Sequence, residues 1–177
     1  MSDFTVAVEP MEKIMTKKLV AVTAACLLII GLASAIDKPE MKEGLWSMHR
    51  EMIDNPGNKK TVSDSTICRN HAYDKHVESH ASPKGCTTVN ESFQSGKYVL
   101  ATHCTIAGTV IDSKGTTTFS SDTAAHSESH ATYTPAMRGV SDTTMIMDSK
   151  YLGSCPAGVQ PGDMTDSNGH VVHLWQH

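Results

Sequence analysis

Aromatic residues are scarce in this sequence, at 5%, and charged residues make up only 19% of its 177 positions. Basic residues are not in excess either, since 15 Lys and Arg stand against 19 Asp and Glu and the formal net charge is −4. A strong electrostatic nucleic-acid binder needs a basic face, so that class is excluded. Ser and Thr are abundant instead, which indicates a β-rich protein with a polar surface.

Common catalytic motifs are missing as well. The sequence has no G-x-S-x-G nucleophile elbow, no H-E-x-x-H zinc motif and no glycine-rich phosphate loop. It has no C-x2-C pair, which argues against a four-cysteine zinc site and against a thioredoxin-like redox role. We therefore expect a protein that is not an enzyme and needs no cofactor, with a bound transition metal as the alternative.

The one long apolar run lies near the N-terminus, at residues 19–32, directly after Lys17 and Lys18. Small residues in the pattern A-x-A follow at 33–35. A basic start, a short apolar core and small residues at the cleavage site define a secretory signal peptide, so we expect cleavage after Ala35. The run is shorter than the roughly 20 apolar residues of a membrane span, which makes an uncleaved anchor the weaker alternative.

The predicted signal peptide sets the organisation of the chain. Acidic residues within the first 14 positions suit such a peptide poorly, so Met11 or Met15 is a more natural start. Cys26 lies in the middle of the apolar run rather than at its end, which argues against a lipid anchor. We expect a periplasmic or secreted protein with a signal peptide at 1–35, a β-rich domain at 36–164, a flexible His-containing tail at 165–177, and no stable membrane anchor after cleavage.

Four cysteines remain after residue 35, namely Cys68, Cys86, Cys104 and Cys155. An even number in an oxidising compartment favours disulfides, and three pairings are possible. Cys86 and Cys104 flank a predicted hairpin, so we prefer a bridge between them and a second bridge from Cys68 to Cys155.

Period-two alternation of apolar and polar residues dominates the rest of the chain. It predicts strands at 44–52, 60–68, 87–94, 97–107, 116–121, 124–134 and 143–152, with turns at 95–96 and 113–115. Residues 71–80 contain few β-branched residues, which favours one short helix there. Because strands follow one another without intervening helices, we expect a single curved antiparallel sheet, open or partly closed, with one short helix and two disulfides.

Four sequence features occur in a familiar order. KEGLW stands at 42–46, Cys68 and Cys86 follow, Cys104 comes after GKY at 96–98, and the series closes with YLGSCP at 151–156. In this order the chain resembles the exported bacterial family of domain of unknown function 3617 (DUF3617). The resemblance covers roughly residues 41–164 and implies an exported β-rich domain. It implies no activity and supplies no catalytic residues.

Histidines provide the candidate metal ligands. His126, Glu128 and His130 would share one face of a strand, and two imidazoles with a carboxylate suit zinc, copper or nickel. Along an extended strand, however, the two rings stand roughly 13 Å apart, so a polar, solvent-facing surface is the simpler interpretation.

Other histidines and the methionines allow similar hypotheses. His170 and His173, together with His177, lie in the expected tail, where a flexible histidine-rich segment can capture metal. His76 and His80 would share a helix face, which is more typical of a solvated surface. Paired methionines, at 48 and 52 and at 145 and 147, could suggest copper handling, although core filling explains them as well.

Two functional hypotheses follow. The first is a non-enzymatic exported module that binds a small ligand or an envelope protein on the concave face of its sheet. The alternative is a periplasmic protein that binds Zn, Cu or Ni through His126, His130 and the C-terminal histidines.

Overall fold

The structure is a computed structural model that describes residues 36, 38–80 and 83–175. The predicted signal peptide, Cys26 and His177 lie outside the described residues. The chain divides into two units at residue 35, and only the second, Ile36–His177, is described below.

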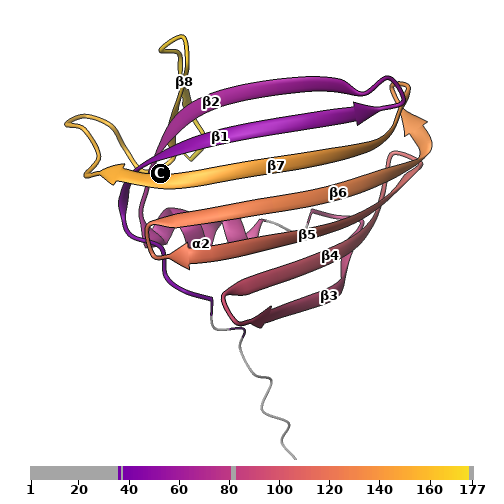
Figure 1. Ribbon diagram of the computed structural model, residues 1–177, viewed down its shortest axis with the longest axis horizontal. Coiled ribbons are helices and arrows are strands. Elements are labelled where there is room, and N and C mark those ends of the chain that lie inside the picture. The colour runs from indigo at the N-terminus through magenta and orange to yellow at the C-terminus, as the bar shows by residue number, and fades with distance from the viewer. Residues whose placement is uncertain (1–35, 37, 81–82, 176–177) are drawn as a thin grey trace, which may run out of the picture. The chain divides into compact units, whose positions relative to one another are not determined.

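One antiparallel sheet of nine strands and one helix make up the described part of the chain (Figure 1). The strands are β1 (Gly44–Asn55), β2 (Lys59–Arg69), β3 (Cys86–Gln94), β4 (Lys97–Ile106), β5 (Thr109–Ser121), β6 (Ala124–Met137), β7 (Val140–Gly153), β8 (Asp163–Asp166) and β9 (Val171–His173), and the helix is α2 (His71–Ser79). Across the sheet they follow the order β3-β4-β5-β6-β7-β1-β2-β8-β9. The predicted fold class is confirmed, and the sheet is open rather than closed.

Tight turns set the register of the strands β3, β4 and β5 and of the pair β6–β7. Each of the three two-residue turns has a positive φ at both positions, and they are Ser95-Gly96, Ala107-Gly108 and Arg138-Gly139. Two consecutive positive φ values define the type I′ turn, whose twist matches that of antiparallel strands.

The turn predicted at residues 113–115 is wrong. The chain turns earlier, at residues 107–108, and β5 continues through 113–115 as a strand. Within β5, a Cβ atom on Gly115 would lie 3.3 Å from the Cβ of Ser129 on β6. This glycine therefore permits close approach of two strands and does not mark a turn.

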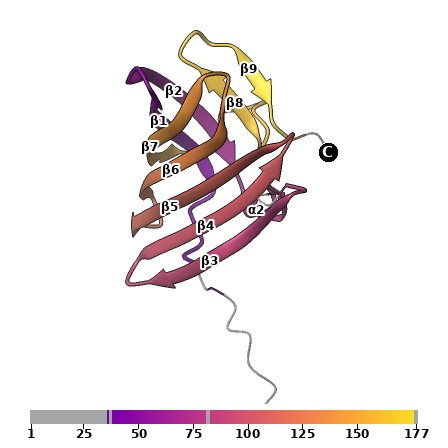
Figure 2. The same ribbon diagram turned by 90° about the vertical axis from the view of Figure 1, so that its right-hand side faces the viewer.

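The sheet is curved, and α2 lies inside the curve (Figure 2). We call the face that carries Trp46 and packs against α2 the inner face, and the opposite face the outer face. Four buried apolar side chains form the core between this face and the helix, and they are Met41, Trp46, Ile67 and Tyr73.

Trp46 is the centre of this core, with 0% of its surface exposed. Its indole Nε1–H donates to the carbonyl of Lys42 at 2.9 Å, and its ring meets that of Tyr151 edge-on at 5.9 Å. The guanidinium of Arg69 lies 5.2 Å from the ring centre, where a cation–π contact is favourable.

The first and last motifs of the series, at 42–46 and 151–156, meet beside Trp46. Leu45 at the start of β1 is in register with Gly153 at the end of β7. Gly44 has a φ of +142°, and a Cβ on it would collide with the carbonyl oxygen of Gly153. Only glycine tolerates both the conformation and the contact, so the GLW segment depends on the GSC segment across the sheet.

The disulfides join Cys68 to Cys155 and Cys86 to Cys104, which is the pairing preferred from the sequence. The first bridge ties the end of β2 to the chain after β7, across a sequence separation of 87. The second joins direct partners on β3 and β4, which are separated by 18 positions.

Residues 165–175 belong to the segment expected to be a flexible tail, yet here they complete a hairpin. β8 pairs with β2 on one side and with β9 on the other. Two backbone contacts secure its connections, because the N–H of Gly162 donates to Cys68 and the N–H of Leu174 donates to Gly162. Trp175 then packs against Tyr73 of α2 at 6.0 Å.

We expect the bridge between Cys68 and Cys155 to stabilise the fold more than the bridge between Cys86 and Cys104. If bridges act by restricting the unfolded chain, the longer loop contributes about 4.5 kcal/mol and the shorter about 3 kcal/mol. Urea unfolding of the two paired Cys→Ser variants measures both losses. Equal losses, or a larger loss for the shorter loop, would contradict this expectation.

Candidate functional site

The inner face is covered by α2 at one end of the sheet only (Figure 1). Away from the helix, half-buried side chains with hydroxyl or thioether groups line this face. By register with the core residues they are Met52 of β1, Leu100 and Thr102 of β4, Ser113 and Thr117 of β5, Ser127 and Ser129 of β6, and Met145 and Met147 of β7. A sheet face of this kind is normally covered by a second layer, and in the described residues no other helix covers it.

Many of the inner-face hydroxyls bond to one another. Thr102 and Ser113 approach to 2.7 Å between their oxygens, and Thr117 and Ser127 to 2.9 Å. Such pairing lets the hydroxyls hydrogen-bond to one another within the sheet, which lowers the cost of covering them with apolar groups. The inner face is therefore able to accept apolar groups despite its many Ser and Thr residues.

Two clefts flank α2. One, of about 260 Å³, lies between the helix and the sheet and is lined by the apolar parts of Met48, Ile67, Tyr73 and Val77 and by charged residues of β2 and α2. The other, of about 410 Å³, lies between the helix and residues 36–41, with Phe119 and Tyr98 at the sheet. Volumes of this order accommodate small organic molecules or part of a larger one.

Capping and an ion pair hold α2 at its N-terminal end. The side chain of Asn70 accepts a hydrogen bond from the N–H of Tyr73 at 2.8 Å, which is a standard N-cap. Arg69 Nε donates to Asp74 at 2.9 Å. The sequence predicted this helix at 71–80, but nothing in its spacing showed that Tyr73 would be the residue buried against the sheet.

Segment 36–42 crosses beside the helix and fixes its other side. Lys38 pairs with Glu78 at 2.9 Å and lies 4.5 Å from the centre of the Tyr98 ring. His71 Nε2 lies 3.1 Å from the carbonyl oxygen of Met41. Burial, together with the nearby carboxylate of Glu91, raises the pKa of Tyr98 well above its usual range, so its phenol stays protonated.

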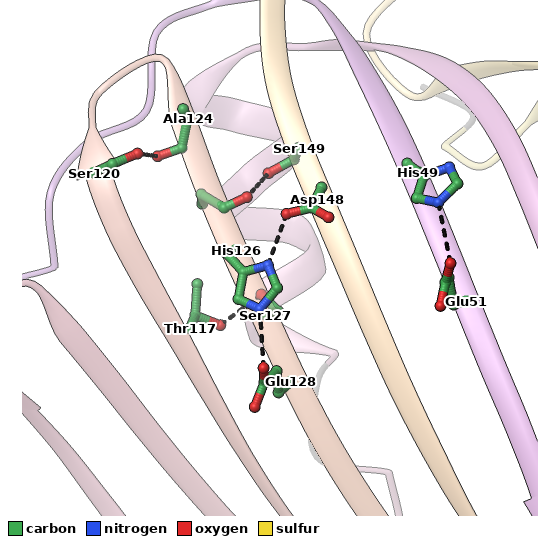
Figure 3. A network of polar contacts seen from close by, with 11 residues as sticks. His49, Glu51, Thr117, Ser120, Ala124, His126, Ser127, Glu128, Asp148 and Ser149 are labelled. Carbon is green, nitrogen blue, oxygen red and sulfur yellow. Dashed lines mark hydrogen bonds and ion pairs between the residues drawn. The ribbon is translucent and has the colours of Figure 1, made fainter.

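The outer face carries His126, one of the histidines that the sequence singled out, and also His49 (Figure 3). His126 of β6 lies between two carboxylates, with Nδ1 at 2.7 Å from Asp148 and Nε2 at 3.2 Å from Glu128. Hydrogen bonds to Asp148 and then to Glu128 raise the pKa of His126. The sequence identified His126 and Glu128, but Asp148 comes from the neighbouring strand β7 and was missed.

The same arrangement recurs two strands away, around His49 of β1. Its Nδ1 lies 2.7 Å from Asp64, and its Nε2 lies 3.7 Å from Glu51. Hydrogen bonding to Asp64 is the main reason that the pKa of His49 is raised. Asp148 is in register with both histidines, so His126, Asp148, His49 and Asp64 form one row across β6, β7, β1 and β2. We call these four residues the histidine row.

The histidine row can take up protons near neutral pH without moving. With both rings protonated, cations and anions alternate along it, and repulsion between the carboxylates is relieved. The Glu51 carboxylate also lies 2.8 Å from Nζ of Lys60. The hydrogen bond from Lys60 lowers the pKa of Glu51.

The other predicted metal ligands also face carboxylates. His130 Nε2 lies 3.4 Å from Asp142, His170 Nδ1 lies 3.2 Å from Asp166, and His173 Nδ1 lies 2.5 Å from Asp163. Each ring thus has its own acidic partner, and the structure does not bring these histidines together. Residues 36–175, apart from the three undescribed positions, contain no group of three or more His, Cys, Asp or Glu placed to hold a metal ion, so the metal hypothesis gains no support.

Comparison with protein families supplies the classification. The family model described as "Protein of unknown function (DUF3617)" matches residues 41–155. The chain belongs to this family. The DUF3617 match begins at Met41 in the core and ends at Cys155, so it spans the two motif ends that meet beside Trp46. No curated protein matches the sequence.

The DUF3617 domain offers two surfaces of different chemistry. Its inner face combines clefts of mixed apolar and charged lining with a curved surface that no other described element covers, and its outer face carries paired, titratable groups. In the described residues no helix is long and apolar enough to cross a membrane. Binding sites are typically concave and apolar with a few polar groups, which favours the inner face as the candidate site.

We expect the stability that the histidine row gives to the DUF3617 domain to decline as the pH rises above the unfolded histidine pKa of 6.5. Because the folded-state pKa values of His49 and His126 are raised, their stabilisation is fully present below the unfolded value of 6.5 and is lost as the pH rises through the raised values. The difference in unfolding free energy between the wild type and His49→Gln/His126→Gln should therefore shrink as the pH rises.

Chemical unfolding at a series of pH values above 5.5 measures this difference, and it avoids the range in which carboxylates such as Asp142 with lowered pKa values take up protons. Thr132→Gln on the outer face of β6 is the control, since it changes no titrating group. Parallel pH profiles for the wild type and the double variant would rule out this role of the row.

Proposed function

We propose that this protein is an exported, non-enzymatic binding module that takes a small apolar or amphipathic ligand on the inner face of its sheet. The observation that carries the proposal is the uncovered inner face, with a cleft on each side of α2. Water in contact with this face is released when a ligand covers it, which favours binding by roughly 25 cal/mol per Å² of apolar surface.

The composition of the inner face supports an adaptable apolar site. Met48, Met52, Met145 and Met147 all lie on it, and Met52 and Met145 are direct partners across β1 and β7. Unbranched thioether side chains can repack around ligands of different shape, which is why methionine is frequent at adaptable binding surfaces. The methionines that the sequence explained as core filling are half-buried rather than buried.

Two observations support export. Lys17, Lys18, the apolar run at 19–32 and the small residues at 33–35 have the order of a secretory signal. Two disulfides are typical of proteins that fold in the periplasm or outside the cell. An exported binding module would carry or shield an apolar molecule in an aqueous compartment.

We expect the purified protein to bind the apolar dye N-phenyl-1-naphthylamine at the inner face, and Met145→Asp to weaken this binding about tenfold. The substitution removes an apolar contact and places a charge where the dye lies. Dye fluorescence gives the affinity, and the emission of buried Trp46 reports whether the fold is intact.

Thr144→Asp is the matched control, because Thr144 is the neighbouring residue on β7 and faces outward beside His130. Equal loss in both variants would place the dye elsewhere, and absence of binding in the wild type would contradict a small-ligand function. In that case an envelope protein would be the remaining occupant of the inner face.

We expect the chain to be processed on export so that the mature protein begins at Ile36. Intact-mass measurement of material recovered from the periplasm or medium should fit residues 36–177 less four hydrogens, the loss that accompanies formation of two disulfides. A mass that includes residues 1–35, or four free thiols in the recovered protein, would contradict the proposed location.

A further inference from the structure

We infer that the inner face binds an anionic amphiphile, with its apolar chain along the methionines and in the cleft under α2 and its anionic head group on Arg50. This inference rests on the proposed function and names the class of its ligand. The evidence lies in the position of Arg50, in its lack of an acidic partner and in the apolar residues that surround it.

Arg50 lies on the inner face of β1. Its Nε donates to the hydroxyl of Ser63 on β2 at 3.4 Å, and it is in register with Met147 on β7. Along β1, Met48 and Met52 lie two residues away on either side, about 6.6 Å at the rise of a strand. Arg50 is thus a cation in the middle of a thioether-lined surface, and its side chain is exposed.

Two cations beside α2 already have carboxylate partners. Arg69 pairs with Asp74, and Lys38 pairs with Glu78. Among the described residues Arg50 forms no ion pair, and its one hydrogen bond is to a neutral hydroxyl. A guanidinium with free N–H groups is suited to a carboxylate or phosphate, which it can bind through two parallel hydrogen bonds.

Nearby carboxylates are engaged elsewhere and would not compete for Arg50. Glu51 follows it in the chain but faces outward and pairs with Lys60. Asp54, the next acidic residue on the inner side of β1, accepts a hydrogen bond from Thr143 at 2.7 Å. The guanidinium of Arg50 is therefore available to an anionic head group at the centre of the methionine-lined part of this face.

The position of the cleft fits an elongated molecule. Met48 lines the cleft between α2 and the sheet, and Arg50 is the next inner-face residue along β1. A head group on Arg50 would thus leave its chain free to enter the cleft past Met48 toward Ile67 and Tyr73, or to extend over Met52 and Met145. Either course covers apolar surface that no other part of the described chain covers.

Competition with dye binding by three molecules of equal chain length tests this inference. Decanoate and decyl phosphate carry an anionic head on the same chain as decanol, which is neutral. We expect the two anions to bind about tenfold more tightly than decanol to the wild type, and Arg50→Gln to abolish that preference. Arg50→Lys should retain part of it, because the charge remains but the paired hydrogen bonds are lost.

Arg138→Gln is the matched control, since Arg138 lies in the β6–β7 turn and its loss should leave the preference unchanged. If decanol binds as tightly as the anions, or if Arg50→Gln keeps the preference, the inference is wrong while small-ligand binding stands. If none of the three displaces the dye, or if the dye itself does not bind, the inference fails together with the proposed function. A preference for decyl phosphate over decanoate, or the reverse, identifies which head group the site prefers.

Discussion

In the part of the chain that the structure describes, a sheet of nine strands has a single nine-residue helix to cover its inner face. Sheets in globular domains normally bury one face completely, and one short helix covers only one end of this one. The packing around Trp46 is concentrated at this covered end of the sheet. Segment 36–42, α2 and Trp175 converge on that end, and four buried apolar side chains suffice there as a core. No other described element covers the remaining inner face.

The pairing of β7 with β1 makes this arrangement possible. These strands lie about 90 residues apart, yet they join the meander β3–β7 to β1, β2 and the C-terminal hairpin. At their meeting point Gly44 and Gly153 touch through their backbones, and the disulfide from Cys68 to Cys155 closes the same corner. The family motifs at the two ends of the match therefore form one structural unit beside Trp46.

The two faces of the sheet divide the polar chemistry of the chain. On the outer face, histidines lie opposite carboxylates of neighbouring strands, so each ring is satisfied within the sheet. On the inner face, hydroxyls pair with one another and Arg50 remains without a carboxylate. The histidines that suggested a metal site thus lie in surface pairs with carboxylates, and the binding surface that we propose lies on the other side of the same strands.

Local patterns in the sequence predicted much of the fold. Alternation placed Trp46, Met48, Arg50 and Met52 on one side of a strand, and the turn at 95–96 and the helix at 71–80 followed from residue type. Errors arose where the meaning of a residue depends on a partner strand. Gly115 resembles a turn residue but faces Ser129, and residues 171–173 look like a loose end but complete a hairpin with β8.

By itself, then, the sequence determined which segments are strands, which side chains share a face, and the four cysteines available for bridging. A two-residue period and turn chemistry are local properties, and they can be recognised without knowing the neighbours. Only the tertiary structure decided that Asp148 lies between His126 and His49, that Tyr73 is the helix residue buried against the sheet, and that Arg50 has no acidic partner among the described residues. Those facts depend on strand order and register, which are fixed by the long-range pairing of β7 with β1 and by packing against Trp46.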